Sequence, residues 1–224
     1  MRNLMGRRSF AGIVGAALLL VASSALTAGA QTVKNGVFVP PPVATYTEKF
    51  EIYGGLLFMN GQAGQNLPKR YNMGGGEGMF TWYVTPKWGV AGDFRWAGGT
   101  TPVNPGAQVY DIQTRPFVSQ TIGMGGVQYR LAHNKHAALQ LHALAGVTNG
   151  NFSHSTHGLD PLVTTGMYRN GSAPMGVVGG SIDLNRSARW AVRLSPEMIF
   201  EHFGTETREF ISISGGVLYR FGKR

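Results

Sequence analysis

Residues 190–201 read WAVRLSPEMIFE, and their pattern is the strongest indication of the secondary structure of this chain. Large apolar side chains such as Trp190 and Leu194 alternate along it with charged ones such as Arg193 and Glu197. Successive side chains of a strand point to opposite faces, so a period of two residues is typical of a β-strand. The stretch therefore predicts a strand with one apolar face and one charged face.

The same alternation recurs along the chain beyond residue 47. It is found at 49–59, 77–84, 90–96, 117–131, 138–148, 175–184 and 208–221, in addition to 189–202. The connections at 61–71, 97–116 and 150–171 are long, whereas those at 85–88, 132–136 and 185–188 are short. Short turns at one end and longer loops at the other predict an all-β fold, an eight-stranded antiparallel up-and-down β-barrel.

The two faces of the predicted strands carry different residues. The apolar face carries residues such as Trp82, Leu141 and Val192. The opposite face carries six positive and six negative side chains: Lys49, Arg95, Arg130, Arg193, Arg208 and Arg220, with Glu51, Glu77, Asp93, Asp183, Glu197 and Glu201. If this face lines the lumen, the charges must pair, because a single buried charge is costly. We therefore expect an ion network that plugs the barrel.

Alternation alone does not say which face points outward. A soluble barrel of the lipocalin type buries its apolar face, whereas a transmembrane barrel turns it toward lipid. Charged residues make up only 14% of the chain, too few to cover a water-soluble barrel, and aromatic residues concentrate near the strand ends. Aromatic girdles at both interfaces are typical of transmembrane barrels. The composition favours the transmembrane version.

The N-terminal segment predicts a secretory signal peptide. Arg2, Arg7 and Arg8 precede an apolar run, and Ala28-Gly29-Ala30 has the small-residue pattern of a cleavage site. An uncleaved anchor over 11–30 is the alternative. We expect three parts: a signal peptide at 1–30, a proline-containing extended leader at 31–47, and the barrel at 48–224.

Charge and cysteine content exclude several function classes. The chain has 20 basic and 11 acidic side chains, and removal of three arginines with the signal peptide leaves 17 − 11 = +6. No basic helix or arginine cluster stands among stacking aromatics, so nucleic-acid binding is not expected. The absence of cysteine excludes disulfides, thiolate metal sites and a cysteine nucleophile. No cofactor is expected.

The end of the chain carries a resemblance to a known family. Ser214, Gly216, Tyr219 and Phe221 stand where the assembly signal of bacterial outer-membrane barrels places a polar residue, a glycine and two aromatic or apolar residues. The tail 222–224 departs from that pattern, in which the aromatic is normally last. The chain thus resembles small outer-membrane β-barrel proteins of the OmpA/OmpX type. The resemblance implies a Gram-negative outer membrane, with periplasmic chaperones and the barrel-assembly machinery as partners during biogenesis.

Two local features suggest chemistry. His154, His157 and Asp160 form an H-x-x-H-x-x-D run, a weak candidate for a metal site or for the histidine of a lipid A hydrolase; a polar surface loop is the simpler interpretation. Pro196 interrupts a strand and lacks an N–H donor, which predicts a bulge or bend there.

These observations lead to a functional expectation. We expect a non-enzymatic outer-membrane barrel with a structural or surface-interaction role and little or no pore activity, since eight strands enclose only enough space for side chains. Outer-membrane lipids are expected partners, and Lys69, Arg70, Arg115 and Arg169 are candidates to contact lipopolysaccharide phosphates. The alternatives are a lipid A-modifying hydrolase and a secreted, soluble lipocalin-like binder.

Overall fold

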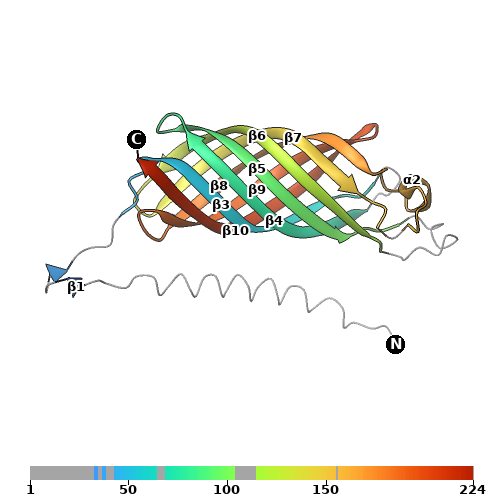
Figure 1. The fold of residues 1–224 in the computed structure, drawn as a ribbon, viewed down its shortest axis with the longest axis horizontal. Helices are drawn as coiled ribbons and strands as arrows, with labels where there is room; N and C mark the ends of the chain where they lie inside the picture. Colours follow the sequence, from blue (N-terminus) through green and yellow to red (C-terminus); the bar gives the residue numbers. More distant parts are fainter. Residues whose placement is uncertain are drawn as a thin grey trace.

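Eight antiparallel strands form a closed barrel in the computed structural model (Figure 1), as the alternating sequence predicts. The structure describes residues 33–34, 37–38, 43–64, 69–103, 115–154 and 156–223. The predicted signal peptide at 1–30 and its cleavage site lie outside the described residues. Within the predicted leader, two short strands, β1 (Val33–Lys34) and β2 (Val37–Phe38), pair antiparallel.

The barrel strands follow one another around the ring. They are β3 (Glu48–Gln62), β4 (Arg70–Tyr83), β5 (Trp88–Thr100), β6 (Phe117–His133), β7 (Ala137–Asn151), β8 (Gly171–Asn185), β9 (Trp190–Phe203) and β10 (Glu206–Lys223). Each strand pairs with its neighbours in sequence, and β10 closes the ring against β3 with Gly216 opposite Gly55. Closure leaves no unpaired edge, which a sheet inside lipid requires.

The barrel has two unlike ends. The short-turn end carries the turns at 84–87, 134–136 and 186–189, together with the start of β3 and the end of β10. The long-loop end carries the longer connections, including the segment 152–170, which contains the short helix α2 (Pro161–Thr164). The brief link between β9 and β10 at 204–205 also lies at this end and is the exception to the trend. In Figure 1 the C-terminus and α2 lie at opposite ends of the barrel.

The strands are 13 to 18 residues long, longer than the alternating segments suggested. At about 3.3 Å per residue and a tilt near 40°, a 15-residue strand rises about 38 Å along the barrel axis, more than the roughly 25 Å apolar band of an outer-membrane barrel. The surplus lies at the long-loop end, where outward positions are exposed and polar, such as Asn72, Thr100 and Asn149. The predicted strands do not include these extensions, because the extensions lack apolar alternation.

The outward face of the barrel is apolar over most of its height. Trp82 is 49% exposed, Leu141 46% and Phe94 60%, whereas Arg193 is 2% exposed and lies inside. A water-soluble barrel would bury its large apolar side chains and expose its charged ones, which is the reverse of this arrangement. The soluble lipocalin-like alternative is therefore wrong. No helix among the described residues is long and apolar enough to cross a bilayer.

Pro196 does not produce the expected bulge. The register between β8 and β9 is the same on both sides of it, with Gly179 opposite Glu197 and Ile182 opposite Leu194; only the pairs between them are missing. A proline on the lipid face removes one ladder bond without shifting the strand. The register shift of the barrel lies instead in β6, between Arg130 and Ala132.

Candidate functional site

The part of the lumen nearest the short turns is filled by a group of ion pairs that we call the lower network. At its centre Glu51 accepts from three guanidinium groups: Arg130 at 2.9 Å, Arg193 at 3.1 Å and Arg220 at 3.1 Å. Asp183 accepts from Arg193 at 2.7 Å and from Arg220 at 3.2 Å. These five side chains come from β3, β6, β8, β9 and β10, so the lower network ties most of the wall together.

Neutral polar side chains complete the lower network. The Tyr83 hydroxyl donates to Gln140 Oε1 at 2.6 Å and accepts from Gln128 Nε2 at 2.7 Å. Gln140 Nε2 in turn donates to Asp183 Oδ2 at 2.6 Å, and the Arg130 guanidinium lies 4.0 Å from the centre of the Tyr83 ring. Buried charges need partners for their remaining donors and acceptors. These side chains supply several of them, whereas Arg130 Nε is buried with no hydrogen-bond partner among the described residues.

A second group, the middle network, surrounds one arginine. Arg95 Nη1 lies 2.5 Å from Glu197 Oε2, Arg95 Nε lies 2.9 Å from Asp93 Oδ1, and Nη2 lies 3.5 Å from Glu77 Oε1. His142 Nε2 lies 2.9 Å from the other oxygen of Glu197. The middle network thus has a formal charge of −2, against +1 for the lower network.

The structure places ten of the twelve predicted lumen charges inside the barrel, and two elsewhere. Lys49 is exposed at the rim, because the first residues of β3 extend past the mouth. Arg208 lies at the other rim, half-buried, where it pairs with Glu206 and donates to the Tyr168 hydroxyl. Glu201 is inside, but its partner is an amide, Gln120 Nε2 at 2.9 Å. Of the predicted charges, the described part of the lumen therefore contains four positive and six negative side chains rather than six of each sign.

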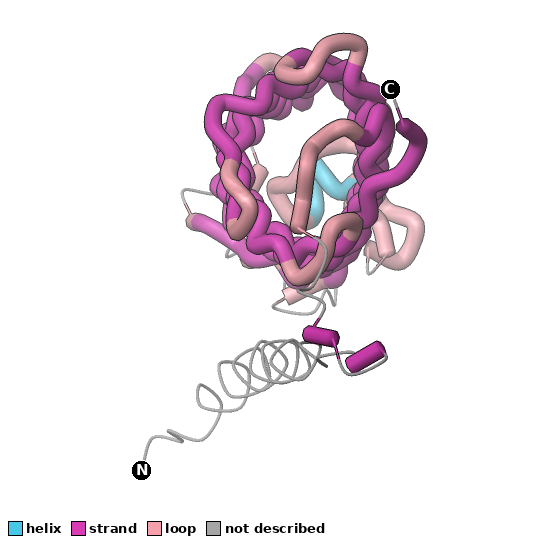
Figure 2. The backbone as a smooth tube through the Cα atoms, turned by 90° about the vertical axis from the view of Figure 1, so that its left-hand side faces the viewer, coloured by secondary structure: helices cyan, strands magenta, loops and turns pink. Residues whose placement is uncertain are grey.

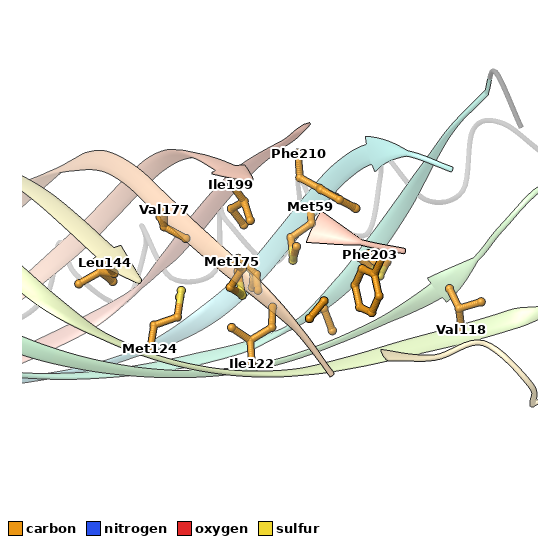
Figure 3. Packing of buried hydrophobic residues seen from close by; sticks show 14 of the residues in the cluster. Met59, Val118, Ile122, Met124, Leu144, Met175, Val177, Ile199, Phe203 and Phe210 are labelled. Carbon is orange, nitrogen blue, oxygen red and sulfur yellow. The ribbon is translucent and has the colours of Figure 1, made fainter. Parts of the chain in front are cut away.

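The lumen toward the long-loop end is mostly apolar, apart from the Glu201–Gln120 contact, and the alternating pattern of the sequence does not predict it. Figure 3 shows Met59, Ile122, Met175 and Ile199 packed inside this part of the barrel; each is at most 5% exposed. We call this part of the lumen the apolar layer. These residues share the inward phase with the charges, and the available signal was that the inward charges of β3, β6 and β8 lie near the short-turn end of each strand, whereas β9 carries Glu197 and Glu201 farther along.

The segment 152–170 covers the mouth above the apolar layer. Seen along the barrel, α2 lies within the outline of the ring (Figure 2). Met167 is 1% exposed, and its sulfur accepts from the Gly64 amide and the Thr101 hydroxyl, both at 3.2 Å. Phe152 and Tyr168 pack on Phe203 with ring centres 5.4 and 5.3 Å away. This connection is therefore a packed plug.

The opposite mouth is covered by Tyr46, just before β3. Its ring lies 4.9 Å from the Arg130 guanidinium and 4.7 Å from that of Arg220. Its hydroxyl donates to the Asn134 carbonyl at 3.1 Å and accepts from Asn185 Nδ2 at 2.6 Å. Burial raises the pKa of the Tyr46 phenol. The backbone of Tyr46 has φ of 57°, a conformation that costs energy for a non-glycine residue and is held here by these contacts.

The candidate metal or catalytic residues do not converge. Asp160 caps α2 by accepting from the Leu162 amide at 3.0 Å and pairs with Arg169 at 2.8 Å, while His157 is exposed. His154 instead points to β6, where its Nε2 lies 3.0 Å from Ser119 Oγ. Over the described residues, no group of three or more histidines and carboxylates could hold a metal ion.

The four residues of the assembly-signal resemblance all lie on β10. Ser214 is buried and accepts from the Tyr53 hydroxyl at 3.0 Å, across the junction with β3. Gly216 lies so close to the backbone of Gly54 that a Cβ there would overlap it. Tyr219 stacks on Phe221 at 5.9 Å on the outward face.

A closed antiparallel barrel with an apolar exterior and a lumen of paired charges is the fold of small bacterial outer-membrane β-barrels. Among solved structures, the chain is similar to Ail, the attachment invasion locus protein of Yersinia pestis, with 17% identity, a TM-score of 0.47, and 78% of this chain and 99% of that one covered. It is also similar to the outer membrane protein OprG from Pseudomonas aeruginosa (12%, 0.49, 81% and 98%) and to Neisserial surface protein A (8%, 0.49, 77% and 97%). No family model and no curated protein matches the chain.

Proposed function

We propose that the protein is exported by its N-terminal signal peptide and acts in the outer membrane of a Gram-negative bacterium as a plugged barrel with a structural or surface-interaction role. In this proposal the short-turn end faces the periplasm and the long-loop end faces outward, the arrangement typical of outer-membrane barrels. The barrel is then an anchor that presents the long-loop end.

The observation that supports this proposal is the filled lumen. Tyr46, the lower network, the middle network, the apolar layer and Met167 follow one another along the barrel axis, and each occupies the interior with buried side chains. An eight-stranded barrel holds just enough interior space for such side chains. To open a water-filled path through the barrel, several ion pairs would have to break and the side chains of the apolar layer would have to separate.

Planar-bilayer recording with the refolded protein tests this function. The expected result is no stable conductance for the wild type. The double variant Arg95→Ala with Glu197→Ala removes the ion pair that spans the lumen. It is the positive control: a conductance above that of the wild type shows that the recording detects an opened lumen. Large, long-lived channels in the wild type would contradict the proposal.

The long-loop end offers polar groups to a surface partner. Lys69, Arg70, Arg115 and Arg169 are all exposed there, although Arg169 pairs with Asp160 and Arg70 Nη2 donates to the Asn60 carbonyl at 2.8 Å. Guanidinium groups bind phosphates through charge-assisted hydrogen bonds, which supports lipopolysaccharide as a neighbour. Binding of purified lipopolysaccharide should weaken when Lys69, Arg70 and Arg115 are changed together to glutamine.

One contact supports the rival enzyme function. His154 Nε2 lies 3.0 Å from Ser119 Oγ, within reach for a general base and a nucleophile, at the outer edge of the barrel. Over the described residues, however, no carboxylate contacts His154 to orient its ring. Mass spectrometry of lipid A from cells expressing wild type, Ser119→Ala or His154→Ala decides between the two functions: identical lipid A in all three would exclude the hydrolase.

A further inference from the structure

A groove lies on the lipid-facing surface where β9, β10 and β3 meet, close to the short-turn end. It has a volume of about 430 Å³ and is lined by Ile52, Tyr53, Gly54, Trp190, Val217 and Tyr219. Gly54 leaves its floor open, because a Cβ built there would meet nothing within 4 Å. The walls are apolar side chains, so the groove fits a hydrocarbon chain.

An aromatic pair marks the depth of the groove in the membrane. The rings of Trp190 and Tyr219 face each other across the β9–β10 ladder with centres 4.6 Å apart. Tryptophan and tyrosine concentrate at headgroup depth, where one end of the ring is apolar and the other is wet. The groove therefore runs from the acyl region toward the headgroups.

The rim beside the groove carries an excess of positive charge, which we call the basic collar. Its members are Lys49, Lys87, Lys135, Arg186, Arg189 and Lys223, each exposed and none ion-paired with a residue that the structure describes. All three short turns contribute to the basic collar, and Glu48 is the nearby acidic side chain, opposite Lys223 in the β3–β10 register.

At the other rim, two of the cations are ion-paired. There Arg169 pairs with Asp160, and Arg208 pairs with Glu206. Lys69, Arg70 and Arg115 of that rim are also exposed, but they lie at the opposite end of the barrel from the groove. The cations beside the groove are Arg189, adjacent to Trp190, and Lys223, just beyond Phe221.

We propose that the groove and the adjoining part of the basic collar form a binding site for one anionic phospholipid. One acyl chain occupies the groove over Gly54, and the phosphate lies at the rim near Arg186, Arg189 and Lys223. Basic residues next to a membrane surface attract anionic headgroups, and the aromatic pair fixes the depth at which chain and headgroup separate. The inference rests on the proposed placement of the barrel across a bilayer.

Native mass spectrometry of the refolded protein in neutral detergent tests the site, with phosphatidylglycerol and phosphatidylethanolamine of matched acyl chains as probes. The wild type should retain one phosphatidylglycerol with at least tenfold higher affinity than phosphatidylethanolamine. Changing Arg186, Arg189 and Lys223 to glutamine should remove this preference, and Gly54→Leu should weaken binding of both lipids by filling the groove.

The controls separate the site from the barrel itself. Lys69, Arg70 and Arg169 changed to glutamine remove three charges at the other rim and should leave the preference intact, as should Gly92→Leu, another outward glycine with open space around it. Equal binding of both phospholipids by the wild type, or an equal loss in the control triple variant, would overturn the inference. Stronger retention of purified lipid A than of phosphatidylglycerol would overturn it as well. Membrane insertion is scored separately, from liposome flotation and the mobility shift on heating, so its failure is distinguishable from failure of the site.

Discussion

Arg95 on β5 and Glu197 on β9 meet across the lumen, with Nη1 2.5 Å from Oε2. The two strands are not neighbours in the barrel, since β6, β7 and β8 lie between them on one side. Both side chains are fully buried. The pair therefore braces opposite walls, and its energy depends on both partners being present.

Removing one partner of this pair should be costly. Glu197→Ala leaves Arg95 with less counter-charge in a buried site, and such changes cost about 3–5 kcal/mol. The double variant Arg95→Met with Glu197→Met should recover little of the loss, because Asp93 and Glu77 also pair with Arg95 and would be left buried without a cation. Urea unfolding of the barrel refolded into liposomes measures this free energy of unfolding. Arg169→Ala breaks an exposed pair and should cost at most about 1 kcal/mol; a Glu197→Ala cost as small as that would contradict the bracing role.

The junction between β3 and β10 should tolerate no side chain at Gly216. A Cβ there would overlap the Gly54 backbone, so Gly216→Ala must force the two strands apart. Gly54→Ala is the matched control, because its Cβ would point outward into open space. Refolding yield, read from the heat-dependent mobility shift on an unboiled gel, should fall for Gly216→Ala and stay near wild type for Gly54→Ala. Equal yields would show that closure does not depend on this close approach.

The stability that Tyr46 contributes at the short-turn mouth should depend on pH. Burial raises the pKa of its phenol in the folded protein above that of the unfolded chain, which is about 10. The neutral phenol is thus favoured by folding, and its stabilisation is present below about pH 10 and lost as the pH rises through the folded pKa. Stability measured from pH 8 to pH 11.5 should fall more steeply for the wild type than for Tyr46→Phe. Parallel curves would contradict this role for Tyr46.

The four tryptophans should report the orientation of the barrel. Trp82, Trp88, Trp96 and Trp190 are each about half exposed on the outward face. In variants that keep one tryptophan each, bromine on lipid acyl chains should quench all four, with Trp88 and Trp190 quenched best by bromine near the headgroup because they lie at strand starts. Protection of any of them from every brominated lipid would place that face in the lumen or outside the membrane.

Much of the fold followed from local pattern. The period of two between Trp190 and Glu201, repeated along the chain, was enough to predict eight strands, because side-chain direction alternates strictly along extended backbone. Low charge content was enough to predict which face meets lipid. The extra length of the strands at the long-loop end was not predictable in this way, since outward positions such as Asn72 and Asn149 lie beyond the apolar band and lose the alternation.

Which side chains meet inside the barrel could not be predicted from the local pattern, because it depends on distances between strands. The alternation along each strand was sufficient to place Arg95, Arg193 and Glu197 on the inward phase, and hence to predict charges in the lumen. The three-dimensional arrangement was needed to show that Arg95 reaches Glu197 across the barrel, that Lys49 lies past the rim, and that the apolar layer separates the lower and middle networks from the loops. The physical reason is that alternation fixes the side on which a residue lies, whereas strand tilt and register fix its height and its neighbours around the ring.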